Sequence, residues 1–271
     1  MKYQPETKEQ LKALCDDLKV NLGDIDTSKI TDMSGLFKSS ERLDFSGIKN
    51  WNVSNVIKMR EMFAYSLFDG DISKWNVSKV KNMEGMFLGS IFNKDISSWN
   101  VSHVKNMAMM FLNCEFNGDI SNWNVSNVEN MEGMFQGSNF NGDISKWNIS
   151  NVTDMSFMFQ GSEFNKDISN WDVSNVKDIA YMFMDSKFNQ SLDTWTINDE
   201  CFISSFARKC PIENDLTKLP KAVVEDLLEQ NDETYTQEQL NAVAEKFSLD
   251  ISNIKPKPEE HIKNESFSYK R

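Results

Sequence analysis

The sequence predicts an α/β solenoid of seven stacked 24-residue coils, each with a short parallel strand and a short helix, closed by helical caps. The seven tryptophans stand 24 residues apart, at Trp51, Trp75, Trp99, Trp123, Trp147, Trp171 and Trp195. Columns of Val, Met and Phe keep the same register, and turn-forming Asn, Gly, Asp and Ser separate the apolar runs. A fixed period of about 20 to 50 residues indicates a solenoid or an array of stacked units.

Each coil is expected to place a strand before a helix. The segment Ile72–Val77 is rich in β-branched and aromatic residues, which favours a short strand. Met83, Met86 and Phe87 follow the i, i+3, i+4 spacing of one or two helical turns. Neither piece can bury its apolar face alone. Successive coils are therefore expected to stack about 4.8 Å apart, with the Trp, Val, Met and Phe columns inside.

The N-terminal end departs from the period and predicts a cap. Within residues 1–26, Thr7 and Gln10 fit a capping box, and leucines follow at helical spacing. We therefore expect an N-terminal helix over Thr7–Lys19 and the repeat solenoid over residues 27–206. Terminal repeats are commonly atypical, so the irregular first coil is expected.

After Trp195 the repeat pattern decays. Helical patterns near Lys221–Gln230 and Thr236–Phe247, the second opening with another capping box, predict a C-terminal helical cap or appendix over residues 207–250. Residues 251–271 have prolines, mixed charge and few apolar side chains, so we expect a flexible tail there.

The composition excludes several classes of partner. A net charge of −12 and a pI near 4.7 argue against binding to nucleic acid or to an anionic membrane. No run approaches the roughly 18 apolar residues of a transmembrane segment, and the N-terminus lacks the apolar stretch of a secretory signal. The sequence alone therefore predicts a soluble chain without a visible export signal. The four cysteines do not follow the repeat, so no disulfide ladder is expected.

The sequence has few residues suited to catalysis. His103 and His261 are its two histidines, and His103 occupies a variable column that other coils fill with Asn or Lys. No Gly-rich phosphate loop, H-E-x-x-H motif or paired C-x-x-C motif is present. The methionine columns have the spacing of core residues rather than of a soft-metal site. We therefore expect neither an enzyme nor a bound cofactor.

One acidic column allows two interpretations. Aspartate recurs without variation at Asp71, Asp95, Asp119, Asp143 and Asp167. In stacked coils these carboxylates would approach within about 5 Å of each other and repel. Each could accept backbone N–H bonds from its own turn, which is the structural interpretation. The row, with the serines beside it, could instead bind calcium or an ordered surface, although calcium needs several oxygen ligands per ion.

Columns that vary from coil to coil are the candidate contacts for a partner. A scaffold position need not change between coils, whereas a recognition surface should. The binding candidates drawn from the varied columns are Lys74, Arg60, Glu84, Met109, Lys146, Phe157 and Tyr181. Phe157 and Tyr181 fall in one column of adjacent coils. They are expected either to form an exposed aromatic pair suited to binding or to pack under the cap.

The recurring phrase M-x-x-M-F-x-x-S-x-F-N-x-D-I-S-x-W-N-V-S-N-V carries a family resemblance. It is seen from Met131 to Val152, with Ile149 at the valine before the second serine, and related copies cover about Thr27 to Phe206. It resembles the repeat of bacterial BspA-like leucine-rich-repeat surface proteins, also described as the bacterial surface-protein 26-residue repeat. The resemblance implies a leucine-rich-repeat-like, right-handed solenoid for binding or adhesion at bacterial surfaces, with no catalytic residues to carry over.

These observations favour a non-enzymatic binding module that presents an extended surface to a protein or glycan partner. The alternative is a regular-face scaffold whose Asp and Ser rows bind calcium or an ordered surface. The resemblance implies a location at the cell surface, whereas the sequence shows no export signal. Neither line of reasoning predicts an oligomeric state.

Overall fold

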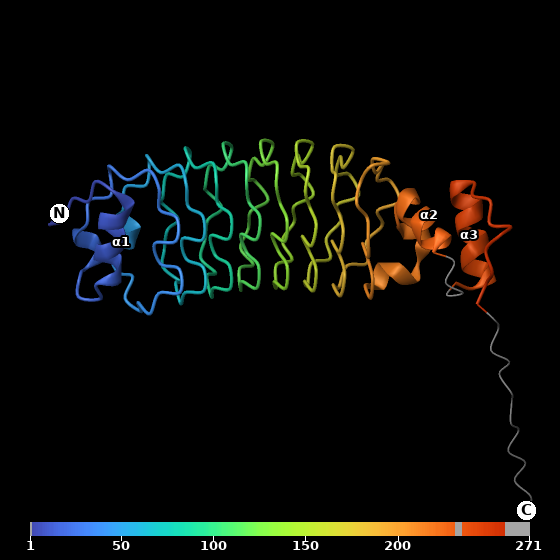
Figure 1. Ribbon diagram of the computed structural model, residues 1–271, viewed down its shortest axis with the longest axis horizontal. Coiled ribbons are helices and arrows are strands. Elements are labelled where there is room, and N and C mark those ends of the chain that lie inside the picture. Colours follow the sequence, from blue (N-terminus) through green and yellow to red (C-terminus); the bar gives the residue numbers. More distant parts are fainter. Residues whose placement is uncertain (1, 231–234, 258–271) are drawn as a thin grey trace, which may run out of the picture.

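The computed structural model describes residues 2–230 and 235–257 of the chain. Figure 1 shows a row of coils standing side by side along the long axis, with helix α1 at the N-terminal end and helices α2 and α3 at the C-terminal end. Parallel single-residue bridges join neighbouring coils, from Lys58 to Asn82 and onward as far as Asp178 and Phe202. We call residues 27–210 the coil row.

The α-helices lie at the two ends of the coil row, and one 3-10 helix, η2, lies within its N-terminal part. Their bounds are α1 Lys8–Asp16, η1 Leu22–Asp24, η2 Ile48–Asn50, η3 Pro211–Asn214, η4 Leu216–Lys218, α2 Lys221–Glu229 and α3 Gln237–Phe247, where η marks a 3-10 helix. The capping box predicted for α3 is confirmed, because Thr236 and Gln239 bond each other's backbone N–H groups. At α1 the Thr7 hydroxyl accepts the Gln10 N–H at 3.3 Å, while the Gln10 side chain accepts from Glu6.

The segment predicted as a flexible tail is ordered over its first residues. Ile251 and Ile254 pack against the core. The Lys257 N–H donates to the Tyr235 carbonyl at 2.8 Å. These contacts tie residues 251–257 to the folded part of the chain. The remainder of the predicted tail, residues 258–271 with His261, lies outside the described residues.

The strand and the helix predicted inside each coil do not form. The described chain has no helix between η2 and η3, and Met83–Phe87 is a run of turns. The single bridge residue of this coil is Asn82, outside the predicted strand Ile72–Val77. Apolar spacing identified the buried side chains but misassigned the backbone that carries them.

The segment predicted as helical instead carries the hydrogen bonds between coils. Alternate N–H groups, those of Met83, Gly85, Phe87 and Gly89, donate to carbonyls of the next coil at 2.8 to 3.0 Å. The carbonyls between them accept from the preceding coil, as Glu84 does from Glu61 at 2.7 Å. We call this arrangement the ladder. Its donated N–H groups all face the C-terminal end of the coil row, and its accepting C=O groups face the N-terminal end.

Two positions in each coil have left-handed backbone, which explains why no helix forms. Gly85 has φ of +58° and Gly89 of +61°. Each is the third residue of a turn, closed for Gly85 by the Met86 N–H and the Met83 carbonyl at 3.1 Å. A type II turn needs positive φ at that position, and a right-handed helix does not tolerate it. The ladder therefore depends on repeated left-handed residues.

Aromatic stacks and tryptophan hydrogen bonds fill the interior of the coil row. Phe87 and Phe92 stack within one coil with centroids 4.1 Å apart, and Phe87 lies 5.7 Å from Phe111 of the next coil. The Trp75 indole Nε1–H donates to the Ile48 carbonyl of the preceding coil at 3.1 Å, and the other tryptophans repeat this bond. The tryptophan side chains thus pack in the core and also donate hydrogen bonds to buried backbone carbonyls.

Side-chain oxygens hold the turns around this core. In one coil Asp71, Asn76 and Asn82 each accept the N–H of the residue two positions on, at 2.8 to 3.2 Å. A second asparagine column links coils, because the Asn93 side-chain oxygen accepts the Asn117 N–H at 3.0 Å. Short polar side chains that bond nearby backbone favour such turns over regular helix or strand.

Gly161 offers a test of the left-handed positions. Its φ is +63°, and the atom nearest to an added Cβ is 4.0 Å away, so an alanine side chain has space there. We expect Gly161→Ala to lower the free energy of unfolding by about 1 to 2 kcal/mol, since only backbone strain opposes it. Urea denaturation measures the change. An unchanged or higher stability, as Gly→Ala gives where φ is negative, would contradict the assignment.

Candidate binding face

The ladder segments expose the most varied side chains of the coil row. We call the outward side chains of residues 57–65, 81–89, 105–113, 129–137, 153–161 and 177–185 the ladder face. In the segment 81–89, Met83, Met86 and Phe87 point into the core and are fully buried, and the corresponding positions of the other segments are buried as well. The positions between them are free to differ from coil to coil.

The ladder face gathers five of the predicted binding residues, namely Arg60, Glu84, Met109, Phe157 and Tyr181. Lys74 and Lys146 are not among them. Both are exposed and follow the turns that Asp71 and Asp143 begin, in a different segment of the coil. The predicted set therefore divides between two parts of the surface.

Carboxylates in the N-terminal half of the ladder face are paired with cations across coils. The Arg60 Nε lies 2.9 Å from the Glu84 carboxylate, and the Lys38 Nζ lies 2.8 Å from that of Glu61. Such partly exposed pairs contribute little stability each, about 0 to 1 kcal/mol. Arg60 and Glu84, predicted as partner contacts, therefore bond each other.

In the C-terminal half of the same face Glu129 pairs with Lys105 and Asp185 with Lys209, but three further carboxylates of the described chain have no such partner. Among the described residues, no Lys, Arg or His nitrogen lies within ion-pair distance of Glu132, Asp154 or Asp178. Burial, then the charge of Asp154, raises the pKa of Glu132, and the same two causes raise the pKa of Asp178. A raised carboxyl pKa means that the surroundings disfavour the charged form. A cationic group of a partner would relieve that cost.

An aromatic pair lies beside these carboxylates. Phe157 and Tyr181 stack with centroids 4.9 Å apart and planes 8° apart. Both have left-handed backbone, with φ of +58° and +60°, where Gly85 and Gly133 stand in other coils. Both side chains are half-buried, so the pair is neither fully exposed nor packed away under the cap, the two alternatives predicted from the sequence. Bulky residues at positive φ are uncommon and strained, and strain of this kind clusters at functional sites.

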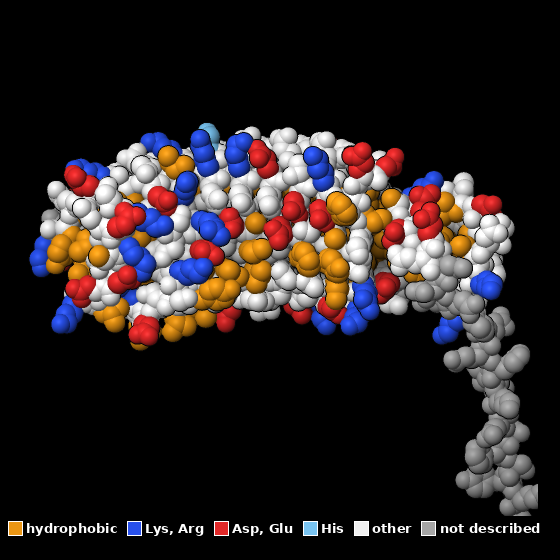
Figure 2. Space-filling model, viewed as in Figure 1, with side chains coloured by type: hydrophobic (Ala, Val, Ile, Leu, Met, Phe, Trp, Pro, Cys, Tyr) orange, Lys and Arg blue, Asp and Glu red, His pale blue; other side chains and the backbone are white. Residues whose placement is uncertain are grey.

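Apolar side chains also reach the surface in the N-terminal half of the ladder face. Tyr65 is 57% exposed, and its ring covers Gly89 so closely that a Cβ there would lie 2.7 Å from it. Figure 2 shows hydrophobic side chains gathered in patches along the viewed face, with Lys and Arg concentrated over the N-terminal half. One surface thus combines apolar platforms with an uneven distribution of charge.

The aspartate row is engaged in its own turns. The Oδ1 atoms of Asp71, Asp95, Asp119, Asp143 and Asp167 each accept the N–H of the serine two residues on, at 2.9 to 3.0 Å. These serine bonds are the main cause that lowers the pKa of each of the five carboxyls. No group of three or more His, Cys, Asp and Glu in the described chain is placed to hold a metal ion.

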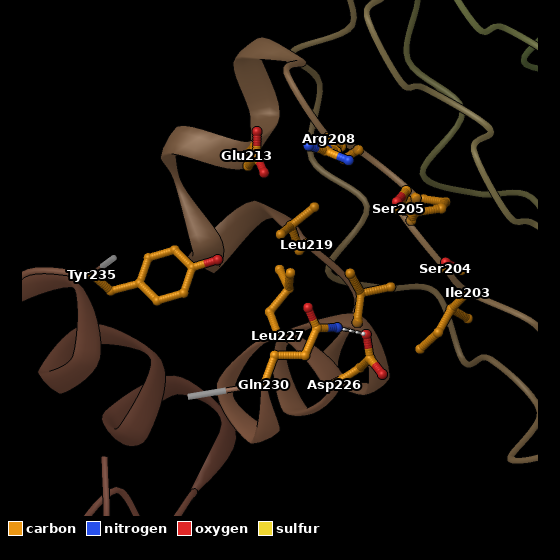
Figure 3. A pocket seen from close by; sticks show the side chains of 13 residues that line it. Ile203, Ser204, Ser205, Arg208, Glu213, Leu219, Asp226, Leu227, Gln230 and Tyr235 are labelled. Carbon is orange, nitrogen blue, oxygen red and sulfur yellow. Dashed lines mark hydrogen bonds between the residues drawn. The ribbon is translucent and has the colours of Figure 1, made fainter. Parts of the chain in front are cut away.

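A pocket of about 420 Å³ lies between the last coil and the C-terminal helices. Figure 3 shows Ser205 and Arg208 on one wall, Leu227 of α2 on another, and the Tyr235 hydroxyl pointing into the hollow. None of the predicted binding residues lines it. His103 is exposed elsewhere, on the turn after Ser102. Cys201 is half-buried, and burial raises the pKa of its thiol to about 11.

Comparison with known proteins places the chain in a family. Residues 8–117 and 110–218 each match the family described as "Mycoplasma protein of unknown function, DUF285". The chain belongs to this DUF285 family. No curated protein and no solved structure matches it significantly. The two DUF285 matches together cover α1, the coil row and η3, so the family's defining sequence is that of the coils.

No helix in the described part of this DUF285 chain is both long and apolar enough to cross a bilayer.

Two acidic positions of the ladder face were missed by sequence reasoning. One column reads Asn82, Asn106 and Asn130 and then changes to Asp154 and Asp178. That change from amide to carboxylate between successive coils was the available signal. A second signal was glycine at equivalent positions of several coils, as at Gly85 and Gly133 and at Gly89, Gly137 and Gly161, which marks the left-handed positions of the ladder.

Calcium distinguishes the two interpretations of the aspartate row. We expect millimolar calcium chloride to leave the Tm unchanged, because each Oδ1 already accepts N–H bonds and each coil supplies one carboxylate. Thermal unfolding with calcium and with magnesium at equal ionic strength measures this. A Tm that rises with calcium alone would instead favour the ion-binding scaffold, since a ligand of the folded state must raise it.

Proposed function

We propose that this chain is a non-enzymatic binding module whose ladder face holds an extended protein or glycan partner. One observation carries the proposal. The inward columns of the ladder segments hardly change between coils, whereas the outward positions change in charge, size and polarity. A rigid scaffold with a varied face is the arrangement that repeat proteins use for recognition.

The C-terminal half of the ladder face supplies the strongest candidate contacts. The stacked Phe157 and Tyr181 offer a flat apolar platform, and aromatic residues are common among binding hot spots. On the same half of the face, Glu132 and Asp178 have no ion pair with any residue that the structure describes, and burial raises the pKa of both. Bulky residues at strained backbone positions and partly buried carboxylates without a cation cost stability, and contact with a ligand would offset that cost.

We also propose that the chain is an adhesion-type protein of the BspA-like kind, displayed at a bacterial surface as a leucine-rich-repeat-like, right-handed solenoid. The recurring M-x-x-M-F and D-I-S-x-W-N-V-S phrases support this, and membership of the DUF285 family is compatible with it. Protease shaving of intact cells, beside a cytoplasmic control protein, tests the location. Full protection of the chain would contradict display at the surface.

Blocking the ladder face tests the proposed function. Gln136→Cys and Gln160→Cys, coupled to a maleimide polymer, would cover the middle of that face. Lys79→Cys and His103→Cys are the control variants, because they carry the same polymer on an exposed turn outside the ladder face. All four variants also carry Cys201→Ser, so that the polymer couples only to the introduced cysteine. The other cysteines, Cys15, Cys114 and Cys210, are buried.

Binding is then measured on arrays of peptides and glycans. We expect the polymer at the two glutamine positions to abolish binding of the ligands that the unlabelled chain retains. Polymer at the two control positions should leave the binding unchanged. Binding that survives a covered ladder face, or that only the control positions abolish, would place recognition elsewhere.

A further inference from the structure

The pocket of Figure 3 lies where the ladder ends. In the coil before it, the N–H groups of Tyr181 and Phe183 donate to the carbonyls of Ser204 and Phe206 at 2.9 and 2.8 Å. In the last coil the corresponding donors are the N–H groups of Ile203, Ser205 and Ala207, and no coil follows. Within the described chain no acceptor meets these three N–H groups.

The three unpaired donors belong to the pocket wall. Ile203, Ser205 and Ala207 all line the hollow, and Ala207 is only 6% exposed. A buried N–H without an acceptor is costly, so water or a ligand normally meets it. The aligned peptide groups of the ladder also place partial positive charge at this end, as at a helix N-terminus. The wall therefore favours a row of oxygen atoms.

The last coil has a fourth ladder N–H group, that of Lys209, and its partner shows which kind of acceptor suits these donors. The Lys209 N–H is met by the Glu213 carboxylate oxygen of η3 at 2.7 Å. A carboxylate of this chain thus occupies, at one end of the row, the place that a backbone carbonyl takes in every earlier coil. The adjacent three places open into the pocket.

The other walls supply a cation and apolar surface. The Arg208 side chain lines the hollow, and within the described residues no carboxylate lies within ion-pair distance of it. Leu219 and Leu227 form an apolar wall with Val223. The Asp226 carboxylate beside them accepts the Gln230 side-chain amide at 2.8 Å and keeps lone pairs for a further donor.

We propose that this pocket binds the C-terminal end of a peptide as a short continuation of the ladder. Two peptide carbonyls, two residues apart, accept from the N–H groups of Ser205 and Ala207, and the terminal carboxylate that follows them pairs with Arg208. One apolar side chain lies against Leu227. The volume of about 420 Å³ falls in the range of small-ligand sites and holds roughly three residues. This site is separate from the ladder face and does not depend on the function proposed for it.

The test uses three probes that all offer oxygen acceptors but differ in whether they have a peptide backbone and a free carboxylate. They are acetyl-Ala-Leu-Ala with a free carboxylate, the same peptide with a C-terminal amide, and succinate. Amide ¹H–¹⁵N shifts of the full chain locate the binding, and titration gives the affinities. We expect both peptides to shift the Ser205 and Ala207 signals, and the free carboxylate to bind about tenfold more tightly than the amide.

Matched variants separate the carboxylate contact from general attraction. Arg208→Gln removes the cation that lines the pocket, whereas Lys209→Gln makes the same charge change one residue away, on a side chain that does not line it. The tenfold advantage of the free carboxylate should vanish in the first variant and persist in the second. Leu227→Trp fills the hollow and should abolish binding of both peptides. Circular dichroism confirms that each variant is folded.

Several results would overturn the proposal. Equal loss in the Arg208 and Lys209 variants would mean non-specific attraction between charges. Binding of succinate without either peptide would assign the pocket to small carboxylates. Shifts confined to the ladder face, or no binding by any probe, would show that the N–H groups of the pocket wall do not bind a peptide. Because the polymer on the ladder face does not cover this pocket, either proposal can fail while the other stands.

Discussion

The ladder of hydrogen bonds from alternate N–H groups of one coil to the carbonyls of the next is the interaction on which this structure depends. It requires a left-handed residue twice in every coil, at positions such as Gly85 and Gly89. That requirement replaces helix and strand with linked turns. The ladder itself has a direction, because its donated N–H groups face the C-terminal end of the coil row and its accepting C=O groups the N-terminal end.

The same constraint explains where function can arise. The inward side chains of the ladder stack on like neighbours in the adjacent coils, so Met and Phe repeat with little change. Outward side chains do not pack against a neighbouring coil in this way, so they can differ from coil to coil. Where Phe157 and Tyr181 replace glycine, the chain accepts backbone strain in return for a stacked pair on the surface. At the C-terminal end the direction of the ladder leaves donors without acceptors, and a pocket forms over them.

The sequence predicted which residues are buried better than it predicted the backbone that carries them. The tryptophan period, the Phe columns and the helices at Lys221 and Gln237 followed from spacing and capping chemistry, because those signals are local. Apolar spacing at Met83 and Phe87 also fits a helix, and the left-handed glycine between them decided otherwise. The aspartate turns could be anticipated from Asp-x-Ser. The unpaired donors at Ser205 and Ala207 could not, because they exist only where the stack of coils ends.

Site-resolved amide hydrogen exchange of the free chain tests the directional ladder most directly. The account predicts slow exchange for Tyr181 and Phe183, whose N–H groups are bonded to the next coil, and faster exchange for Ser205 and Ala207 in the last one. Lys209, held by Glu213, should exchange more slowly than those two. Equal protection of Ser205 and Tyr181 would mean that the last row is already paired, which would contradict the account.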